Sequence, residues 1–281
     1  MHIKGMEKFR EKLPSYSGRK IMIIFLIALL AGCLNLIFLV LMYILPSLHP
    51  NYQFLIIIEP FLPIFGQMVS ITLGFMFISR VWSKRERLLS ESRETAYQKG
   101  IIVGFLGIPI VIATVIHRLI PIELFWKPIN PITQKLASPL FLGNQPLSIV
   151  AFIFGLIITL VGFLTIIRTF AVFGIDYMAL VYIYYPNESK LKKNQIYSVV
   201  RHPTYFAVIL IGLGGWIGYL SVYALSSFIL FVIGINIHLK FVEEKELIER
   251  FGQEYHNYKK KVPILVKPHK IPMLFKFILF G

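Results

Sequence analysis

Five long apolar runs constrain this chain more than any other feature of its sequence. Ile21–Leu45 is a stretch of 25 residues without a charged side chain. The runs Phe54–Ser79, Ile101–Ile120 and Leu147–Phe170 carry charged side chains only near one end. A helix needs roughly 20 apolar residues to cross the hydrocarbon core of a bilayer. These four runs therefore predict four single membrane spans.

The fifth run is too long for one span. Tyr205–Leu239 has 35 residues and no Asp, Glu, Lys or Arg, which suits a hairpin of two helices of about 17 residues each. Four glycines in its first arm favour close packing between the arms, and the bend is expected at Gly218–Ser221. The fold predicted is all-α: a polytopic membrane protein with about six transmembrane helices, four single and two in a C-terminal hairpin.

The charge distribution predicts the orientation. The net charge is +15, and loops rich in Lys and Arg alternate with poor ones along the chain. The bias of basic loops toward the inside then places both termini in the cytoplasm. Topology and anionic lipid headgroups account for these charges, so no nucleic-acid partner is expected. The predicted partners are the bilayer and a lipid or lipidated substrate, and the oligomeric state stays open.

The composition divides the chain into two halves. Residues 1–146 hold three spans and are expected to be a scaffold, whereas residues 147–281 hold one span, two polar segments, the hairpin and a charged tail. The tail is expected to be a helix over Phe241–Val262, bent near Gly252. In the scaffold, Glu59, His117 and Arg118 lie near the ends of their runs and are expected at the membrane interface.

The hairpin brings the two polar segments together, because one precedes its first arm and the other follows its second. Arg201, His202 and Tyr205 should therefore lie close to Glu243 and Glu244. Interface anchoring and a solvated charged helix are the ordinary explanations of such segments. Their enforced proximity favours a site at this membrane boundary.

The order of these motifs resembles the C-terminal half of isoprenylcysteine carboxyl methyltransferases and, more loosely, the related membrane phospholipid methyltransferases. The resemblance covers about residues 160 to 265 and rests on Arg201-His202-Pro203-x-Tyr205, the hairpin, Glu243-Glu244, Phe251-Gly252-x-x-Tyr255-x-x-Tyr258 and Val262-Pro263.

The resemblance implies an S-adenosylmethionine-dependent methyltransferase, with carboxyl O-methylation favoured and a cofactor pocket on the cytoplasmic side. It implies no metal site. The residues it assigns to the cofactor are Ser189, Lys190, Leu191, Lys192, Tyr197, His202, Pro203, Thr204, Tyr205 and Glu243. Arg201 and Glu244 are expected to be catalytic, and Arg168, His238 and Lys240 to bind substrate.

The chain departs from the family pattern at three positions. Gln195 and Ala207 stand where the family has glycines, and Leu239, between His238 and Lys240, replaces an arginine used for the substrate carboxylate. A lipid amine is therefore an alternative acceptor to a carboxylate. Two other classes also stay open: a nicotinamide-dependent membrane reductase of the sterol-reductase kind, and a non-enzymatic membrane protein or transporter.

Overall fold

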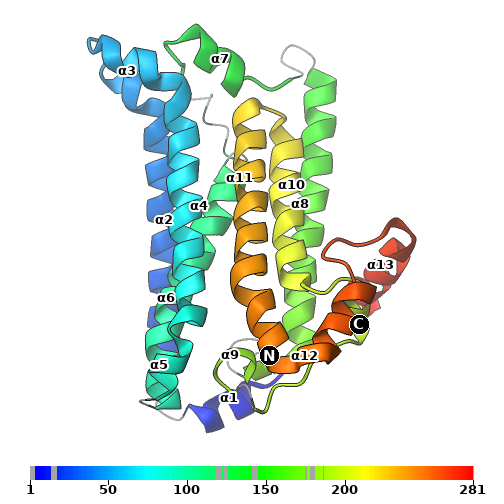
Figure 1. The fold of residues 1–281 in the computed structure, drawn as a ribbon. Coiled ribbons are helices and arrows are strands. Elements are labelled where there is room, and N and C mark those ends of the chain that lie inside the picture. The colour runs from blue at the N-terminus through cyan, green and yellow to red at the C-terminus, as the bar shows by residue number, and fades with distance from the viewer. Residues whose placement is uncertain are drawn as a thin grey trace.

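The computed structural model describes residues 4–13, 18–90, 92–117, 120, 122, 126–140, 145–174, 176–177, 181–185 and 187–280. Within these residues the regular structure is helical, which confirms the predicted all-α fold. The long helices stand side by side, and both chain ends lie at the same end of the bundle (Figure 1). That end carries the basic segments of the chain.

Six apolar helices form the bundle. By length and composition, four segments could cross a membrane: Met22–Leu48, Gln53–Ser83, Gln145–Phe173 and Val222–Lys261. Two shorter apolar helices, Leu106–Ile116 and Pro203–Tyr219, complete the set. The bundle helices are α2 (Gly18–Leu48), α4 (Leu62–Ser83), α6 (Arg93–Ile116), α8 (Gln145–Phe173), α10 (Pro203–Tyr219) and α11 (Val222–His238).

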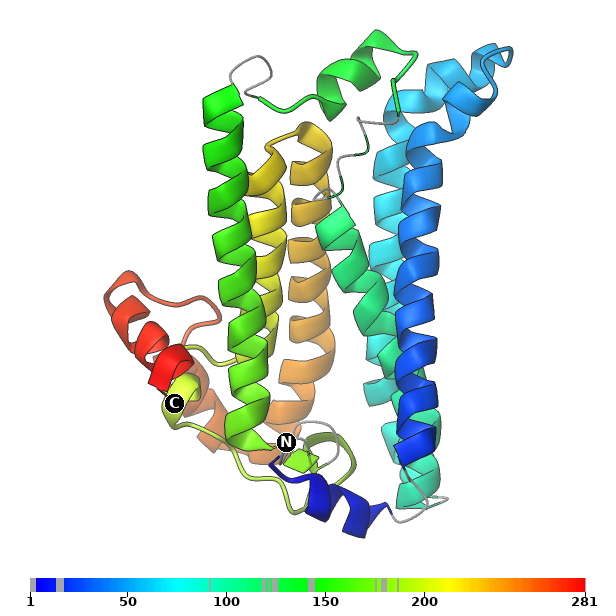
Figure 2. The same cartoon turned by 180° about the vertical axis from the view of Figure 1, so that it is seen from behind.

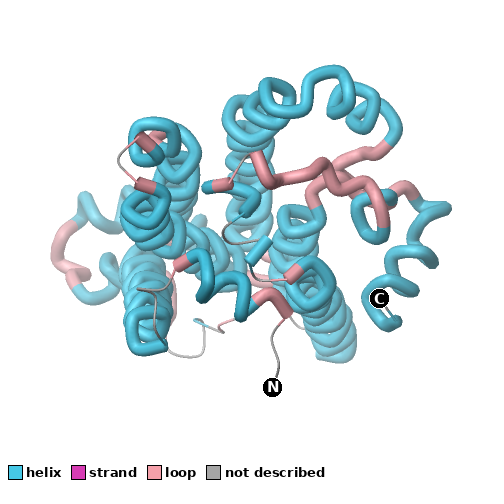
Figure 3. The backbone as a smooth tube through the Cα atoms, turned by 90° about the horizontal axis from the view of Figure 1, so that it is seen from below, coloured by secondary structure: helices cyan, strands magenta, loops and turns pink. Residues whose placement is uncertain are grey.

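Short elements and the tail helix α12 cover the two ends of the bundle. At the end with the termini lie α1 (Met6–Lys12), α5 (Arg85–Leu89), α9 (Tyr182–Tyr184), the 3-10 turn Gln195–Ser198 and α12 (Glu244–Lys261). At the opposite end lie α3 (Gln53–Ile58), the 3-10 turn Glu59–Phe61 and α7 (Pro131–Ala137). Figure 3, viewed from below, shows the long helices end-on with loops and short helices laid across the near end.

The predicted hairpin is confirmed. Its two helices, α10 and α11, have 17 residues each, and the bend lies at Leu220 and Ser221. Leu220 adopts a left-handed conformation (φ 51°) that ends α10. The Ser221 hydroxyl accepts a hydrogen bond from the Ala224 amide (3.2 Å) and so caps α11.

The close packing expected between the hairpin arms occurs elsewhere. α10 packs far more extensively on α8 than on α11, as Figure 2 shows from behind. A Cβ atom added to Gly155 of α8 would lie 2.4 Å from the Gly218 amide nitrogen, and one added to Gly214 would lie 2.4 Å from the Gly155 carbonyl oxygen. Gly214 and Gly218 of α10 therefore allow the close approach of α8, where helix backbones meet without side chains between them.

One apolar core joins the two halves of the chain. Ile71 and Phe75 of α4 pack with Ile211 of α10 and with Phe231 and Ile235 of α11. The division into 1–146 and 147–281 stays a prediction, but the scaffold half borders the hairpin directly.

A neutral polar network lies at the end of the bundle away from the termini. Gln67 donates to the Tyr223 carbonyl (3.0 Å) and contacts the Tyr43 hydroxyl (3.4 Å), and Ser226 donates to Gln67 (2.6 Å). The Tyr43 hydroxyl lies 3.2 Å from His117 Nε2, and His117 Nδ1 lies 2.5 Å from the Thr114 carbonyl oxygen. Both ring nitrogens of His117 therefore have partners.

The anchors expected in the scaffold lie at the ends of their spans but not at the protein surface. Glu59 and His117 are fully buried, and the Glu59 carboxylate accepts the backbone amides of Ile129 (3.1 Å) and Asn130 (2.7 Å). Their position at the membrane interface stays a prediction, and the structure adds that contacts from the segment before α7 cover Glu59. Arg118 lies outside the described residues.

The last helix, α13 (Ile271–Phe280), lies along the outer side of α8 near the end with the termini (Figures 1 and 2). It follows the 3-10 turn Pro268–Lys270. Leu274, Phe277 and Ile278 are buried in the core cluster, whereas Phe280 is exposed.

Candidate functional site

The site is built where α11 passes into the tail helix. A π-helical turn, Leu239–Glu243, links α11 to α12 without a break in the helical path. Wide turns of this kind locally redirect the side chains that follow. Both Glu243 and Glu244 are buried here, and they face the residue that precedes Pro203, the first residue of α10.

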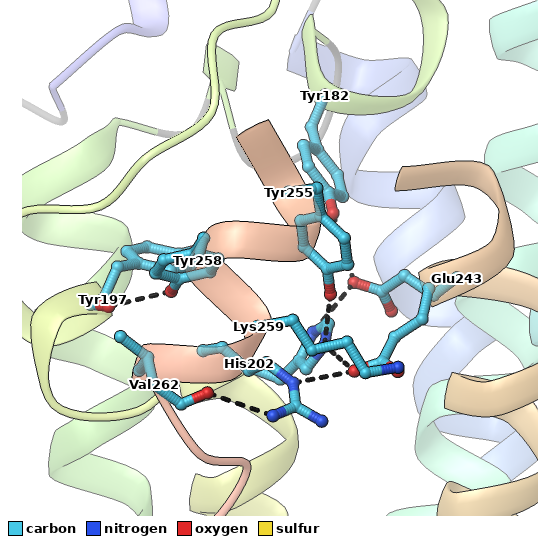
Figure 4. A network of polar contacts seen from close by, with 10 residues as sticks. Tyr182, Tyr197, His202, Glu243, Tyr255, Tyr258, Lys259 and Val262 are labelled. Carbon is cyan, nitrogen blue, oxygen red and sulfur yellow. Dashed lines mark hydrogen bonds and ion pairs between the residues drawn. The ribbon is translucent and has the colours of Figure 1, made fainter. Parts of the chain in front are cut away.

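That residue is His202, whose ring lies between the two carboxylates. His202 Nδ1 is 3.3 Å from Glu243 Oε1, and Nε2 is 3.3 Å from Glu244 Oε1. Arg201 Nε donates to Glu244 Oε1 (2.7 Å), and Lys259 Nζ donates to Glu244 Oε2 (2.6 Å). Figure 4 shows this network. The predicted proximity of Arg201 and His202 to the two glutamates is confirmed, and their roles stay predictions.

The arrangement favours a protonated His202. A neutral imidazole has a single N–H and would turn a lone pair toward one of the two carboxylates. Burial alone lowers the pKa of His202, but hydrogen bonds and charge from Glu243 and Glu244 outweigh it, so the net pKa is raised. The Tyr255 hydroxyl also lies 3.4 Å from His202 Nε2. Three positive groups, Arg201, Lys259 and His202, therefore face the two carboxylates of Glu243 and Glu244.

Aromatic side chains surround a narrow space beside Glu243. The Tyr182 hydroxyl donates to Glu243 Oε1 (3.2 Å), and the Tyr258 hydroxyl donates to the Tyr197 carbonyl (2.8 Å). Burial raises the pKa of Tyr197, and the charge of Glu243 adds to this effect, so its phenol stays neutral. The space measures about 30 Å³ and is lined by Tyr177, Tyr182, Lys190, Leu191, Lys192, Tyr197, Arg201, Leu247, Phe251, Tyr255 and Tyr258.

A larger hollow opens on the other side of Tyr258. Its volume is about 300 Å³, and its lining is Lys193, Ser198, Glu254, Asn257, Tyr258, Lys261 and Val262. Tyr258 belongs to the walls of both spaces. Ligand pockets commonly begin at about 300 Å³, so the larger hollow is of that size, whereas the narrow one holds only a water or two.

The segment predicted to line the cofactor lies over the tail helix. Arg250 of α12 donates to the Ser189 hydroxyl (2.9 Å), and the Tyr177 hydroxyl donates to the Lys190 carbonyl (2.6 Å). The Lys192 ammonium lies 4.6 Å from the centroid of the Tyr177 ring. Lys190, Leu191 and Lys192 line the aromatic space, and the role of residues 189–192 in cofactor binding stays a prediction.

Four other predicted residues are spread more widely. Pro203 is buried and Thr204 half-buried in the first turn of α10. Arg168 Nε donates to the Phe277 carbonyl of α13 (3.4 Å) and thus lies outside the glutamate network. Lys240 is exposed, with its ammonium 5.1 Å from the Phe241 ring centroid.

His238 and Tyr205 lie at the membrane side of the network. Tyr205 hydrogen-bonds to Glu243, and its ring centroid is 5.8 Å from that of His238. His238 Nδ1 is 2.9 Å from Ser79 Oγ of α4. The site therefore runs from the aromatic space, past Glu243 and Tyr205, to a histidine at the end of α11.

Several residues of the site were not predicted. Tyr255 and Tyr258 belong to the motif that begins at Phe251, and Tyr182 lies in a tyrosine-rich run, so a local sequence signal existed for these three. Arg85 of α5 gave no such signal: it donates to Glu246 Oε1 (2.7 Å), which also binds Arg250. This contact ties the scaffold half to the helix that carries the site.

The fold and the site together define a class: a polytopic helical membrane protein with a buried charged network at one end of its bundle. A family model described as phospholipid methyltransferase matches residues 150–254. This match covers the arginine–histidine motif, the hairpin and both glutamates, and it supports the predicted relationship to the isoprenylcysteine carboxyl methyltransferases.

A curated relative points the same way. The chain is 34% identical over 87 residues to a methanethiol S-methyltransferase from Pseudomonas deceptionensis, an alignment that covers 29% of this chain. The chain spans about 30% of the length of that relative. No solved structure matches the chain.

Proposed function

We propose that the protein is an integral membrane methyltransferase that uses S-adenosylmethionine and acts on a membrane-soluble acceptor. The observation that carries the proposal is the aromatic-lined space between residues 189–192 and α12, which adjoins buried Glu243 within the matched segment. We also propose that this end of the bundle faces the cytoplasm, because the basic segments gather there.

The residues present suit the cofactor chemically. Tyrosine faces attract a sulfonium cation, and a nearby carboxylate adds to this attraction. The space of about 30 Å³ is too small for a nucleoside-bearing ligand as it stands. Tyr258 forms part of the wall of both this space and the hollow of about 300 Å³. We therefore expect the Tyr258 side chain to move when the cofactor binds, so that the two spaces join.

The proposed assignments follow this geometry. Residues Ser189–Lys192 hold the cofactor from the loop side, Tyr197 and His202–Tyr205 from the start of the hairpin, and Glu243 from its end. When bound, S-adenosylmethionine supplies a methyl group on a positively charged sulfur. The chain itself positions the two reactants and excludes water, which is sufficient for much of the rate of an in-line displacement.

The acceptor has three candidate chemistries. The family resemblance favours an isoprenylcysteine-like carboxylate, the matching family model is named for phospholipids, and the curated relative is named for a thiol. Carboxylates, lipid amines and thiols are therefore the acceptors to test.

Ligand binding tests the proposal most directly. We expect S-adenosylhomocysteine to raise the melting temperature of the purified protein and NADPH to leave it unchanged. His202→Ala and Glu243→Ala should each weaken S-adenosylhomocysteine binding at least tenfold, about 1.4 kcal/mol. His256→Ala and Glu249→Ala, at exposed positions of the same tail helix, are matched controls and should keep the affinity. Stabilisation by NADPH alone would support the reductase instead.

A further inference from the structure

The cations around the glutamate network are already paired. Arg201 donates to Glu244 (2.7 Å) and to the Val262 carbonyl (3.0 Å). Lys259 also donates to Glu244 (2.6 Å), and His202 lies between both carboxylates. A carboxylate acceptor entering here would have to displace a partner of Glu244 and would meet the negative charge of Glu243. The network is therefore poorly suited to hold a carboxylate through an ion pair.

The two glutamates are also poor proton acceptors. Glu243 accepts hydrogen bonds from Tyr182 and Tyr205 and contacts His202. Glu244 is bound by Arg201, Lys259 and His202. Donors and positive charges of this kind stabilise the ionised carboxylate and weaken its attraction for a proton.

His238 is a basic side chain that lies beside these paired groups. It is 1% exposed, and its ring lies 5.8 Å from those of both Phe75 and Tyr205. Its Nδ1 meets the Ser79 hydroxyl at 2.9 Å, but its Nε2 has no hydrogen-bond partner among the residues that the structure describes. Buried polar atoms in native proteins are rarely left unpaired, and a catalytic role is one explanation of those that are.

The residues around His238 bear on the side from which a methyl acceptor would approach it. Ile235 and Leu239 beside it in the chain belong to the apolar core shared by α4, α6, α10 and α11. The aromatic space and the lysines of residues 190–192 lie beyond Tyr205 and Glu243, toward the loops. The His238 ring therefore lies at the boundary between this apolar core and the network around Glu243.

We infer that His238 Nε2 is the catalytic proton acceptor for a neutral, protic methyl acceptor, a thiol or amine on an apolar group, that enters from the membrane. The inference deepens the proposed methyl transfer and rests on it. When Nδ1–H donates to Ser79 Oγ, Nε2 presents its lone pair, which is the tautomer that a general base requires.

The step balances as follows. The bond between the donor's sulfonium sulfur and the methyl carbon breaks, and its electron pair stays on that sulfur, which becomes a neutral thioether. The acceptor's sulfur or nitrogen forms the new bond to the methyl carbon. The proton of the acceptor passes to His238 Nε2, so the positive charge that was on the sulfonium is now on the imidazolium. The imidazolium later releases this proton to solvent.

The test compares two thiols in vesicles containing the full-length protein. Octanethiol is largely un-ionised near neutral pH and needs a base, whereas nitrothiophenol is ionised and does not. His238→Asn keeps an amide near the position of Nδ1, for the Ser79 bond, and removes Nε2. We expect it to slow methylation of octanethiol at least about a hundredfold and to slow methylation of nitrothiophenol less than about threefold, because no proton is transferred. His117→Asn, at the buried histidine of the opposite end of the bundle, should affect both thiols alike and only slightly.

Two readouts besides activity accompany these rates. S-adenosylhomocysteine affinity should be unchanged in His238→Asn, which shows a folded cofactor site. In histidine-labelled wild-type protein, octanethiol should shift the nitrogen resonance of His238 Nε2. Equal rate losses with both thiols would overturn the inference.

The outcomes separate this inference from the proposed function. If the protein binds S-adenosylhomocysteine but methylates only the carboxylate of N-acetyl farnesylcysteine, the methyltransferase proposal stands and the role of His238 falls. If S-adenosylhomocysteine does not bind at all, both fall.

Discussion

The two ends of the bundle each hold a buried polar network with a histidine, and the two networks differ in charge and completeness. At the end away from the termini, both ring nitrogens of His117 have uncharged partners, the Tyr43 hydroxyl and the Thr114 carbonyl. At the other end, charged groups surround His202, and His238 Nε2 has no hydrogen-bond partner within the described part of the chain. A complete neutral network fixes helix packing, whereas a charged, incomplete network costs stability and is the one to expect at a site of chemistry.

The largest expected effect breaks the charged network. Glu244→Gln leaves Arg201, Lys259 and protonated His202 facing one fewer negative charge, and loss of one partner from a buried pair costs about 3 kcal/mol or more. The matched change at the neutral end is Gln67→Leu, which removes side-chain hydrogen bonds worth about 1 kcal/mol each. Reversible unfolding in mixed micelles measures both losses. Equal losses at the two ends would contradict the distinction between the networks.

The next effect depends on pH. The pKa of His202 is raised from its ordinary value of 6.5, so the folded protein keeps this proton to a higher pH than the unfolded chain does. The stabilisation is complete below about pH 6.5 and is lost as the pH rises through the raised pKa, by at most about 1.4 kcal/mol per pH unit. Unfolding measured from about pH 6 to about pH 9 should show this fall in the wild type. His202→Gln should lack it, and an identical slope in the variant would rule out His202 as its source.

The smallest expected effect concerns the loop that leads into the charged end. Gln195 has a positive φ of 52°, a left-handed conformation that costs a residue with a Cβ roughly 1–2 kcal/mol. Gln195→Gly should stabilise the protein by about 0.5 kcal/mol, since the larger chain entropy of glycine offsets part of the gain. Gln253→Gly, at an exposed helical position of α12, should instead destabilise by about 1 kcal/mol. A loss of stability in both variants would show that Gln195 carries no such strain.

Much of the fold was predictable because membrane helices follow local rules. The apolar runs gave the six bundle helices, the hairpin bend fell at Leu220 and Ser221, and the backbone of α12 departs from helical angles at Gly252 (φ 52°). A long uncharged segment must satisfy its backbone hydrogen bonds internally to cross lipid, so its sequence alone determines its structure. Helix partners were less predictable: Gly214 and Gly218 of α10 face α8, whereas Gly215 faces α6. Small residues permit close approach without specifying the neighbour.

The site, like the fold, has some features that the sequence predicts and others that depend on how the helices pack. By itself the sequence determined that Arg201 and His202 lie near Glu243 and Glu244, since a hairpin of two equal helices must return to the side from which it began. Only the tertiary structure decided which of these charges are paired and that Arg85 of the scaffold binds Glu246. It also decided that Ser79 contacts one nitrogen of His238, while the other has no partner among the described residues. Such contacts join residues far apart in the chain, and their partners depend on how separate helices pack, which no local pattern encodes.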